Sequence, residues 1–282
     1  MNSSRKAKGM RAPVNVNVRS QPELENASLI VGWQEDAGKL GPKVIDYLNK
    51  HIKGKSFCEI EPERFFPMGG VVIDNDIAQF PVSRFYAGAR KDLVIFESNQ
   101  PPNERYRFLN TILDVGEYYC KIKELYTVSG TIAPIAHTAP RRLMTVFNQP
   151  ELQRRLRGYE LENMTWEGPP AINSFLLWAA QKRGIPGVSL WPEVAFYLAG
   201  AEDTRAVKSV LSFFNRRFDL GLDWTELDSK IKAQDEKLAL LRRENQEIDK
   251  YIRTLEVGLS LNEGEQLALA QGVTEFLGKT PS

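Results

Sequence analysis

Residues 164–199 of the chain read MTWEGPPAINSFLLWAAQKRGIPGVSLWPEVAFYLA. We expect a short strand that ends at Glu167-Gly168, and then a helix that carries the apolar run Phe175–Trp178 and stops at Gly184. A second apolar run, Val188–Trp191, predicts another strand. A strand, a helix and a strand in so few residues are typical of a β-α-β crossover, the repeating unit of a parallel sheet. Ligands usually bind at the loops that leave such strands.

The same alternation of strands and helices extends along most of the chain. Upstream, Ala27–Trp33 predicts a buried strand, and the helix expected from Pro42 has its apolar residues Val44, Ile45, Leu48 and Ile52 at helical spacing. Further strands are expected at Ser56–Phe66, Val71–Asp74, Ile77–Phe80, Ser83–Ala89, Asp92–Phe96, Leu125–Ile132 and Leu143–Phe147. Further helices are expected at Asn103–Lys123, Pro150–Arg157 and Asp203–Phe218. Alternating elements predict an α/β domain at residues 25–222, with a mixed sheet between two helical layers.

The two ends of the chain differ from this domain. Residues 1–24 are basic and predict a disordered arm. Residues 223–282 predict a helical extension, because apolar residues recur there in alternating steps of three and four. This heptad seam comprises Trp224, Leu227, Ile231, Gln234, Leu238, Leu241, Asn245, Ile248, Ile252, Leu255 and Leu259. About 36 residues would form a continuous rod of roughly 54 Å. The seam must be buried, either in a helical hairpin within the chain or by self-association between chains as a coiled coil.

Composition excludes several classes of protein. The chain has 282 residues, of which 42% are hydrophobic, and a formal net charge of +1, so we expect neither a general nucleic-acid binder nor nucleic-acid partners. No apolar run is long enough to span a membrane. Cys58 and Cys120 are far apart in sequence and belong to no CxxC motif. They favour a reducing, cytoplasmic location over a disulfide scaffold or a structural zinc site.

A polar loop between the first strand and the first helix contains the first candidate for binding. Gly32 and Gly38-Lys39 lie where a phosphate-binding loop belongs, but the spacing is one residue too long and Leu40 replaces the required Ser or Thr. One interpretation is a polar loop whose glycines permit a tight entry into the helix. The other is a ligand-facing loop with Asp36 as a hydrogen-bond acceptor.

A second group of candidates follows the later strands. His137, with Arg141 and Arg142 just beyond it, could hold a phosphate or a carboxylate. In the alternative interpretation His137 caps a turn and both arginines form surface ion pairs. Glu167 and Glu193, at or beyond strand ends, could act as an acid or a base. With no nucleophile elbow and only two histidines in the sequence, we expect no catalytic set, no metal site and no cofactor.

A series of short motifs resembles the proteasome assembly chaperone 2 family over about residues 27–230. They are Gly32-Trp33, Asp36-Ala37-Gly38, Ser129-Gly130, His137-Thr138, Glu167-Gly168, Asn173, Leu176, Gly184-Ile-Pro186, Ser189-Leu-Trp191 and Tyr197-Leu-Ala199. The resemblance implies an α/β/α core like that of purine nucleoside phosphorylases, in homo-oligomers with trimers among them. It also implies proteasome or other assembly subunits as partners. The chain departs from the family where Pro192-Glu193 replaces a usual Pro-His. It also ends without the hydrophobic-Tyr-any motif by which some archaeal members dock on the proteasome.

Two hypotheses for the function follow. The first is a non-enzymatic, oligomeric assembly chaperone or scaffold that acts through its helical extension and the loops at the sheet edge. The second is a small-molecule binder or enzyme for a nucleoside, phosphate or carboxylate. Its pocket would lie at the strand ends, near Asp36, Gly130, His137, Glu167 and Glu193.

Overall fold

The computed structural model describes residues 12–67, 72–74, 77–88, 92–165, 167 and 171–279. The strands are β1 (Val16–Val18), β2 (Ser28–Trp33), β3 (Lys55–Ile60), β4 (Val72–Asp74), β5 (Ile77–Gln79), β6 (Ser83–Ala87), β7 (Leu93–Ser98), β8 (Glu124–Val128), β9 (Thr131–Ala133), β10 (Leu143–Phe147), β11 (Glu162–Asn163) and β12 (Gly187–Ala195). The α-helices are α1 (Leu40–Ile52), α2 (Arg105–Cys120), α3 (Pro150–Arg155), α4 (Ile172–Lys182), α5 (Thr204–Phe218), α6 (Thr225–Glu244), α7 (Gln246–Glu256) and α8 (Glu263–Lys279). Short 3-10 helices are η1 (Ala37–Lys39), η2 (Pro62–Arg64), η3 (Arg157–Tyr159) and η4 (Phe196–Leu198).

A mixed sheet forms the centre of the fold, as predicted. Ten of the described strands belong to it, in the order β1-β3-β6-β7-β2-β8-β12-β10-β11, with β9 paired to β12. Its middle strands, β7, β2, β8 and β12, pair in parallel with one another. Antiparallel pairs continue the sheet on both sides. Strand β1 lies within the arm predicted to be disordered, and it pairs with β3. Residues 1–11 of that arm are outside the described part of the chain.

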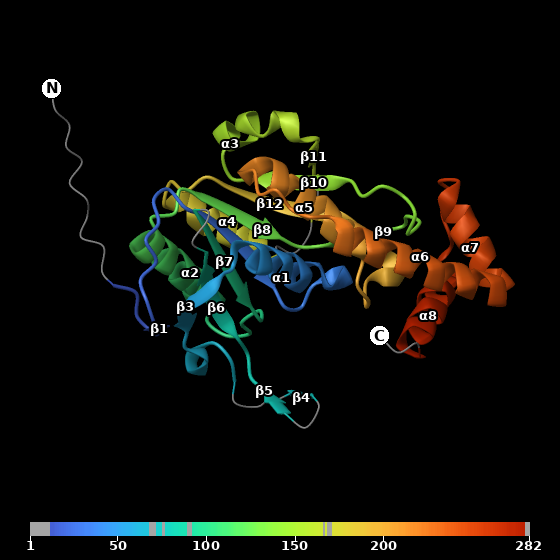
Figure 1. The fold of residues 1–282 in the computed structure, drawn as a ribbon, viewed down its shortest axis with the longest axis horizontal. Helices are drawn as coiled ribbons and strands as arrows, with labels where there is room; N and C mark the ends of the chain where they lie inside the picture. Colours follow the sequence, from blue (N-terminus) through green and yellow to red (C-terminus); the bar gives the residue numbers. More distant parts are fainter. Residues whose placement is uncertain are drawn as a thin grey trace.

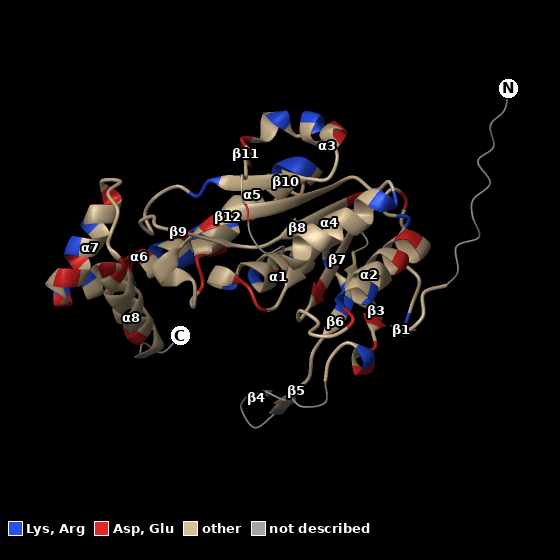
Figure 2. Ribbon diagram, turned by 180° about the vertical axis from the view of Figure 1, so that it is seen from behind, with Lys and Arg blue, Asp and Glu red and all other residues tan. Residues whose placement is uncertain are grey.

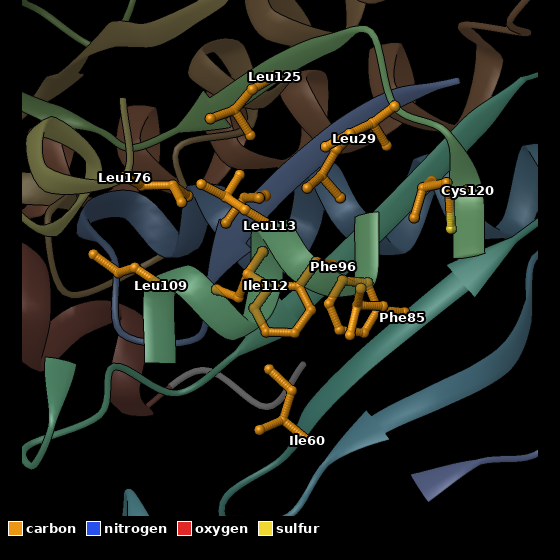
Figure 3. Packing of buried hydrophobic residues seen from close by; sticks show 14 of the residues in the cluster. Leu29, Ile60, Phe85, Phe96, Leu109, Ile112, Leu113, Cys120, Leu125 and Leu176 are labelled. Carbon is orange, nitrogen blue, oxygen red and sulfur yellow. The ribbon is translucent and has the colours of Figure 1, made fainter. Parts of the chain in front are cut away.

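Helices cover both faces of the sheet (Figures 1 and 2). On one face, α2 and α4 pack against the strands through a core that includes Leu29, Phe96, Ile112 and Leu176. Figure 3 shows the α2 side chains meeting those of the strands in this layer. On the other face, α1 and α5 pack through a separate core. The four apolar residues predicted for the inner side of α1 are each at most 1% exposed, which confirms the helical spacing seen in the sequence.

The predicted β-α-β crossover at residues 164–199 is wrong, although its helix and second strand are present. Strand β11 ends at Asn163, before Glu167-Gly168, and it pairs in parallel with β10. Strand β12 pairs with β10 in the antiparallel direction. Thus β11 and β12 run in opposite directions on either side of β10, and α4 does not connect two parallel neighbours. The parallel partner of β12 is β8.

Three other predicted boundaries differ for local reasons. The strand expected at Leu125–Ile132 is divided into β8 and β9, because the chain bends at Ser129-Gly130 to donate hydrogen bonds to Asp36. The strand expected to reach Phe66 stops at Ile60, and Pro62 begins η2. Helix α1 starts at Leu40 rather than Pro42. The hairpin of β4 and β5 forms, and its predicted turn at Asn75-Asp76 lies outside the described residues.

The helical extension is not the continuous rod that the heptad pattern predicted. Asn245 adopts an extended conformation (φ −133°, ψ 104°) between α6 and α7, and its side chain accepts hydrogen bonds from the N–H groups of Glu247 and Ile248. Most apolar residues of the seam are instead buried within the chain, where α6, α7 and α8 enclose a core with η4 that includes Leu238 and Ile252. Leu227 packs in the core beneath α1 and α5, and Leu259 is 62% exposed. The helices gather at one end of the molecule (Figure 1). Of the two interpretations of the seam, intramolecular packing is observed.

Charged residues of both signs lie on α6 and α7 (Figure 2). Arg242, on α6, forms ion pairs with Asp249 and Glu256, on α7, at 2.7 Å each. These pairs hold the two helices against each other at the break. In the described part of the chain, no helix is both long and apolar enough to cross a lipid bilayer.

Candidate functional site

The carboxyl ends of β2 and β8 meet at Asp36, in the loop that leaves β2. Its Oδ1 atom accepts hydrogen bonds from the Gly130 N–H at 3.0 Å and the Ser129 hydroxyl at 2.9 Å. It also accepts from the Ala37 N–H at 3.0 Å, while Oδ2 accepts from the Gly41 N–H at 2.9 Å. Asp36 therefore joins the loop after β2 to the loop after β8.

The Asp36 carboxylate is a hydrogen-bond acceptor, as one interpretation predicted, but all of these donors belong to its own chain. Burial raises the pKa of Asp36 to about 6, and the hydrogen bonds from Gly130, Ser129 and Gly41 oppose that rise. The polar-loop interpretation also explains Gly41, because a Cβ atom there would lie 2.4 Å from the carbonyl oxygen of Trp33. Gly130 is similarly confined, since a Cβ atom would lie 2.8 Å from Val194.

A buried ion pair lies beside this loop. The Arg141 guanidinium contacts the Asp203 carboxylate at 3.0 Å, and both side chains are only 1% exposed. Arg141 also donates to the carbonyl oxygens of Ala136 and His137 at 3.2 Å. Asp203 accepts hydrogen bonds from the N–H groups of Ala206, where it caps α5, and Ala195. The prediction that Arg141 forms a surface pair is wrong, because its charge is neutralised inside the protein.

His137 is buried against Tyr197 from η4. The Tyr197 hydroxyl accepts a hydrogen bond from the His137 N–H at 2.5 Å and lies 2.9 Å from its Nδ1 atom. Burial lowers the pKa of His137 to about 4, so the ring is neutral at pH 7. A neutral, enclosed ring does not supply the positive charge that the predicted phosphate or carboxylate site requires.

Glu193, on β12, is also buried and paired. Its Oε1 atom contacts the Arg142 guanidinium at 2.5 Å, and its Oε2 atom accepts from the Arg142 backbone N–H at 3.2 Å. Arg142 reaches Glu162 as well, at 3.5 Å. Arg142 is largely exposed and does form the predicted surface pair. Glu193 joins β12 to the start of β10, and its carboxylate is engaged by that arginine.

Four of the five predicted site residues lie at this end of the sheet. Asp36 contacts Gly130 directly, and Glu193 pairs in register with Thr131, the next residue. The backbone of Asp203 donates to the Gly38 carbonyl oxygen at 3.0 Å, which connects the Asp36 loop to Arg141 and thus to His137. Glu167, the fifth residue, is exposed and takes part in none of these contacts.

Two residues of this network were not predicted from the sequence. Asp203 could be recognised as the cap of a helix, but its partner Arg141 is 62 positions away. Tyr197 is 60 positions from His137. No local pattern predicts such pairs. Among the described residues, no cluster of three or more His, Cys, Asp or Glu side chains could hold a metal ion.

The outer surface of α2 and α4 carries a patch of exposed aromatic residues. Tyr106, Phe175 and Trp178 are 47%, 42% and 42% exposed. The rings of Tyr106 and Trp178 lie 5.4 Å apart, and the Lys182 ammonium is 3.7 Å from the centre of the Trp178 ring. We call Tyr106, Phe175 and Trp178 the aromatic patch.

Comparisons with solved structures show the same fold. The proteasome activator PbaB of Pyrococcus furiosus is 22% identical, with a TM-score of 0.68 over 82% of this chain and 100% of that one. A Mycobacterium tuberculosis protein of unknown function is 14% identical, with a TM-score of 0.74 over 89% of this chain and 93% of that one. A PAC2 family protein of Streptomyces avermitilis is 21% identical, with a TM-score of 0.66 over 79% and 99% of the two chains.

No curated protein matches the sequence. A family model described as the PAC2 family matches residues 29–242, which is most of the chain and nearly the span over which the motifs resemble proteasome assembly chaperone 2. The match includes the whole network around Asp36, and it extends into α6. The chain therefore belongs to the PAC2 family.

Proposed function

We propose that the protein is a non-enzymatic assembly chaperone or scaffold that acts through contacts with protein chains, including copies of itself. The aromatic patch is the observation that carries this proposal. Large aromatic side chains are enriched at protein interfaces, and an exposed group of them marks an interaction surface. The patch lies on two helices packed against the main core, so it presents a pre-formed surface.

The buried network supports the same proposal. Asp36, His137, Glu193 and Arg141 are each satisfied by partners within the chain. The alternative, a pocket at those residues for a nucleoside, phosphate or carboxylate, is therefore less well supported. A thermal-shift measurement tests it, because a ligand at 100 times its dissociation constant adds about 2.7 kcal/mol to the stability. A shift with a nucleoside or phosphate would favour the alternative.

The relatives indicate the kind of partner. PbaB is described as a proteasome activator, and PbaA of the same organism as a homologue of a proteasome-assembly chaperone. By analogy, we propose a homo-oligomer, a trimer by preference, that engages proteasome or other assembly subunits. We place it in the cytoplasm, because Cys58 and Cys120 are both free thiols.

Light scattering on the full chain tests the role of the aromatic patch. Each chain has a mass of 32.0 kDa, and we expect the wild type to have a multiple of that mass. We expect Trp178→Glu to shift the protein towards monomer, because it places a charge in the contact surface. Leu240→Glu is the matched control, since Leu240 is 47% exposed on α6 and outside the patch. A monomeric wild type, or a W178E variant of unchanged mass, would refute the proposal.

A further inference from the structure

A cavity of about 520 Å³ lies where the first turn of α4 meets β10 and β12. Ala171 and Ser174 form its wall on the helix side, and Met144 and Trp191 form its wall on the sheet side. These two sheet residues face each other across the antiparallel pair of strands. The volume is within the range of about 300–1,000 Å³ that is usual for small-molecule sites.

The lining of this cavity determines which ligands fit it. None of the eight described residues that line it carries a charge. Met144, Met164 and the indole of Trp191 offer apolar surface, while Thr131 and Ser174 offer hydroxyl groups. Burying a carboxylate or phosphate against such walls would remove it from water without a cationic partner, which is unfavourable. The lining therefore favours an uncharged molecule with an apolar body.

One buried polar atom of a lining residue has no partner among the described residues. The Nε1 atom of Trp191 is buried, and no hydrogen-bond acceptor within the described part of the chain contacts it. The indole of Trp33, by contrast, donates to Oδ1 of Asn173 at 2.7 Å. Asn173, in the first turn of α4, thus supplies an acceptor to the Trp33 indole and not to that of Trp191. A buried donor without a partner is costly, so a molecule that supplied an acceptor there would gain that hydrogen bond.

We propose that this cavity binds a small, uncharged aromatic molecule that carries a single hydrogen-bond acceptor, such as a carbonyl oxygen. The ring lies against the methionine side chains, and the acceptor takes the hydrogen bond from Trp191 Nε1. Methionine side chains re-pack readily, and the contact with the enclosed indole nitrogen requires such a rearrangement of the lining. The proposal does not depend on the oligomer, because every residue that it uses comes from one chain.

A matched pair of probes tests the proposal on the full-length protein. Acetophenone carries a carbonyl acceptor, and isopropylbenzene has a similar shape without one. The chain contains five tryptophans, so ¹⁵N-labelled protein gives an indole N–H resonance for each, and Trp191→Phe identifies that of Trp191. We expect acetophenone to shift this resonance saturably and to bind about fivefold more tightly than isopropylbenzene, which is the effect of one net hydrogen bond.

Variants and a charged probe complete the test. Trp191→Phe should reduce acetophenone affinity to that of isopropylbenzene, whereas Trp178→Phe, on the outer side of α4, should leave it unchanged. Benzoate should bind more weakly than acetophenone. The proposal is overturned if the Trp191 resonance does not shift, if the two matched probes bind equally, or if benzoate binds best. The two outcomes that compare probes are read on the wild-type chain alone and hold even if a variant does not fold.

Discussion

Asp36 and His137 should oppose each other in the pH dependence of stability. The pKa of Asp36 is raised from 3.8 to about 6, so the folded state binds this proton more tightly than the unfolded state. The free energy of unfolding due to Asp36 is therefore highest below pH 3.8 and is lost as the pH rises through 6. The pKa of His137 is lowered from 6.5 to about 4. Its contribution is present above pH 6.5 and is lost as the pH falls through 4.

Each effect is on the order of 3 kcal/mol, because one pH unit between the folded and unfolded pKa values corresponds to about 1.36 kcal/mol. The two windows overlap between about pH 4 and pH 6. In the wild type the two trends should nearly cancel there. Asp36→Asn should remove one trend and make the stability rise with pH across this window. His137→Asn should leave only the Asp36 effect, so that the stability falls as the pH rises across this window. In the double variant both effects are absent, so its stability should differ from that of the wild type by the same amount at each pH.

Urea unfolding at pH 4, 5, 6 and 7, followed by circular dichroism, measures these slopes. The titration of other groups cancels when the unfolding free energy of a variant is subtracted from that of the wild type at the same pH. The pH-independent cost of each substitution adds a constant to this difference. We expect the difference in unfolding free energy between Asp36→Asn and the wild type to change by about 3 kcal/mol across the window. If that difference is constant from pH 4 to pH 7, the Asp36 carboxylate titrates normally, and burial does not control its charge.

Two further predictions concern the stability of the fold, and both are measured by urea unfolding. Arg141→Met should cost about 3–5 kcal/mol, because it leaves the buried Asp203 carboxylate without its ion pair. The double variant with Asp203→Asn should cost less, because it removes the charge and keeps an acceptor for the N–H groups of Ala195 and Ala206. Leu238→Ala should cost about 2–5 kcal/mol, because the side chain is fully buried, whereas Leu240→Ala, on the same helix but 47% exposed, should stay within about 0.5 kcal/mol. Equal costs at Leu238 and Leu240 would show that α6 does not pack as described.

Periodicity predicted the elements better than their connections. The spacing of apolar residues identified β2, α1 and α5 because burial of one face produces that spacing directly. The direction of β12 relative to β11 has no such local signature. It is decided by the pairing of both strands with β10, which hydrogen bonds in parallel to one and antiparallel to the other. A sequence window that contains the helix and its flanking strands does not include that third strand.

For the heptad seam and for the candidate site, the partners of the named residues could not be read from the sequence. Asn245 was visible as a polar exception in the seam, but its side chain competes for backbone N–H groups and ends one helix while it starts the next. The candidates after the strand ends were correctly placed near one another, with the exception of Glu167. Their partners, such as Asp203 for Arg141, come from distant positions in the sequence. The side chains that were expected to contact a ligand therefore form hydrogen bonds and ion pairs within the protein.

Helix α4 connects the two proposed binding surfaces. Its first turn lines the cavity at Ser174, and the aromatic patch begins at the next residue, Phe175, and includes Trp178. If contacts at the patch order α4, acetophenone should bind the oligomer more tightly than the W178E monomer, and it should strengthen the oligomer by the same factor. Typical couplings are about 5–150-fold. Equal acetophenone affinity in the monomer and the oligomer would show that α4 holds the two sites without coupling them.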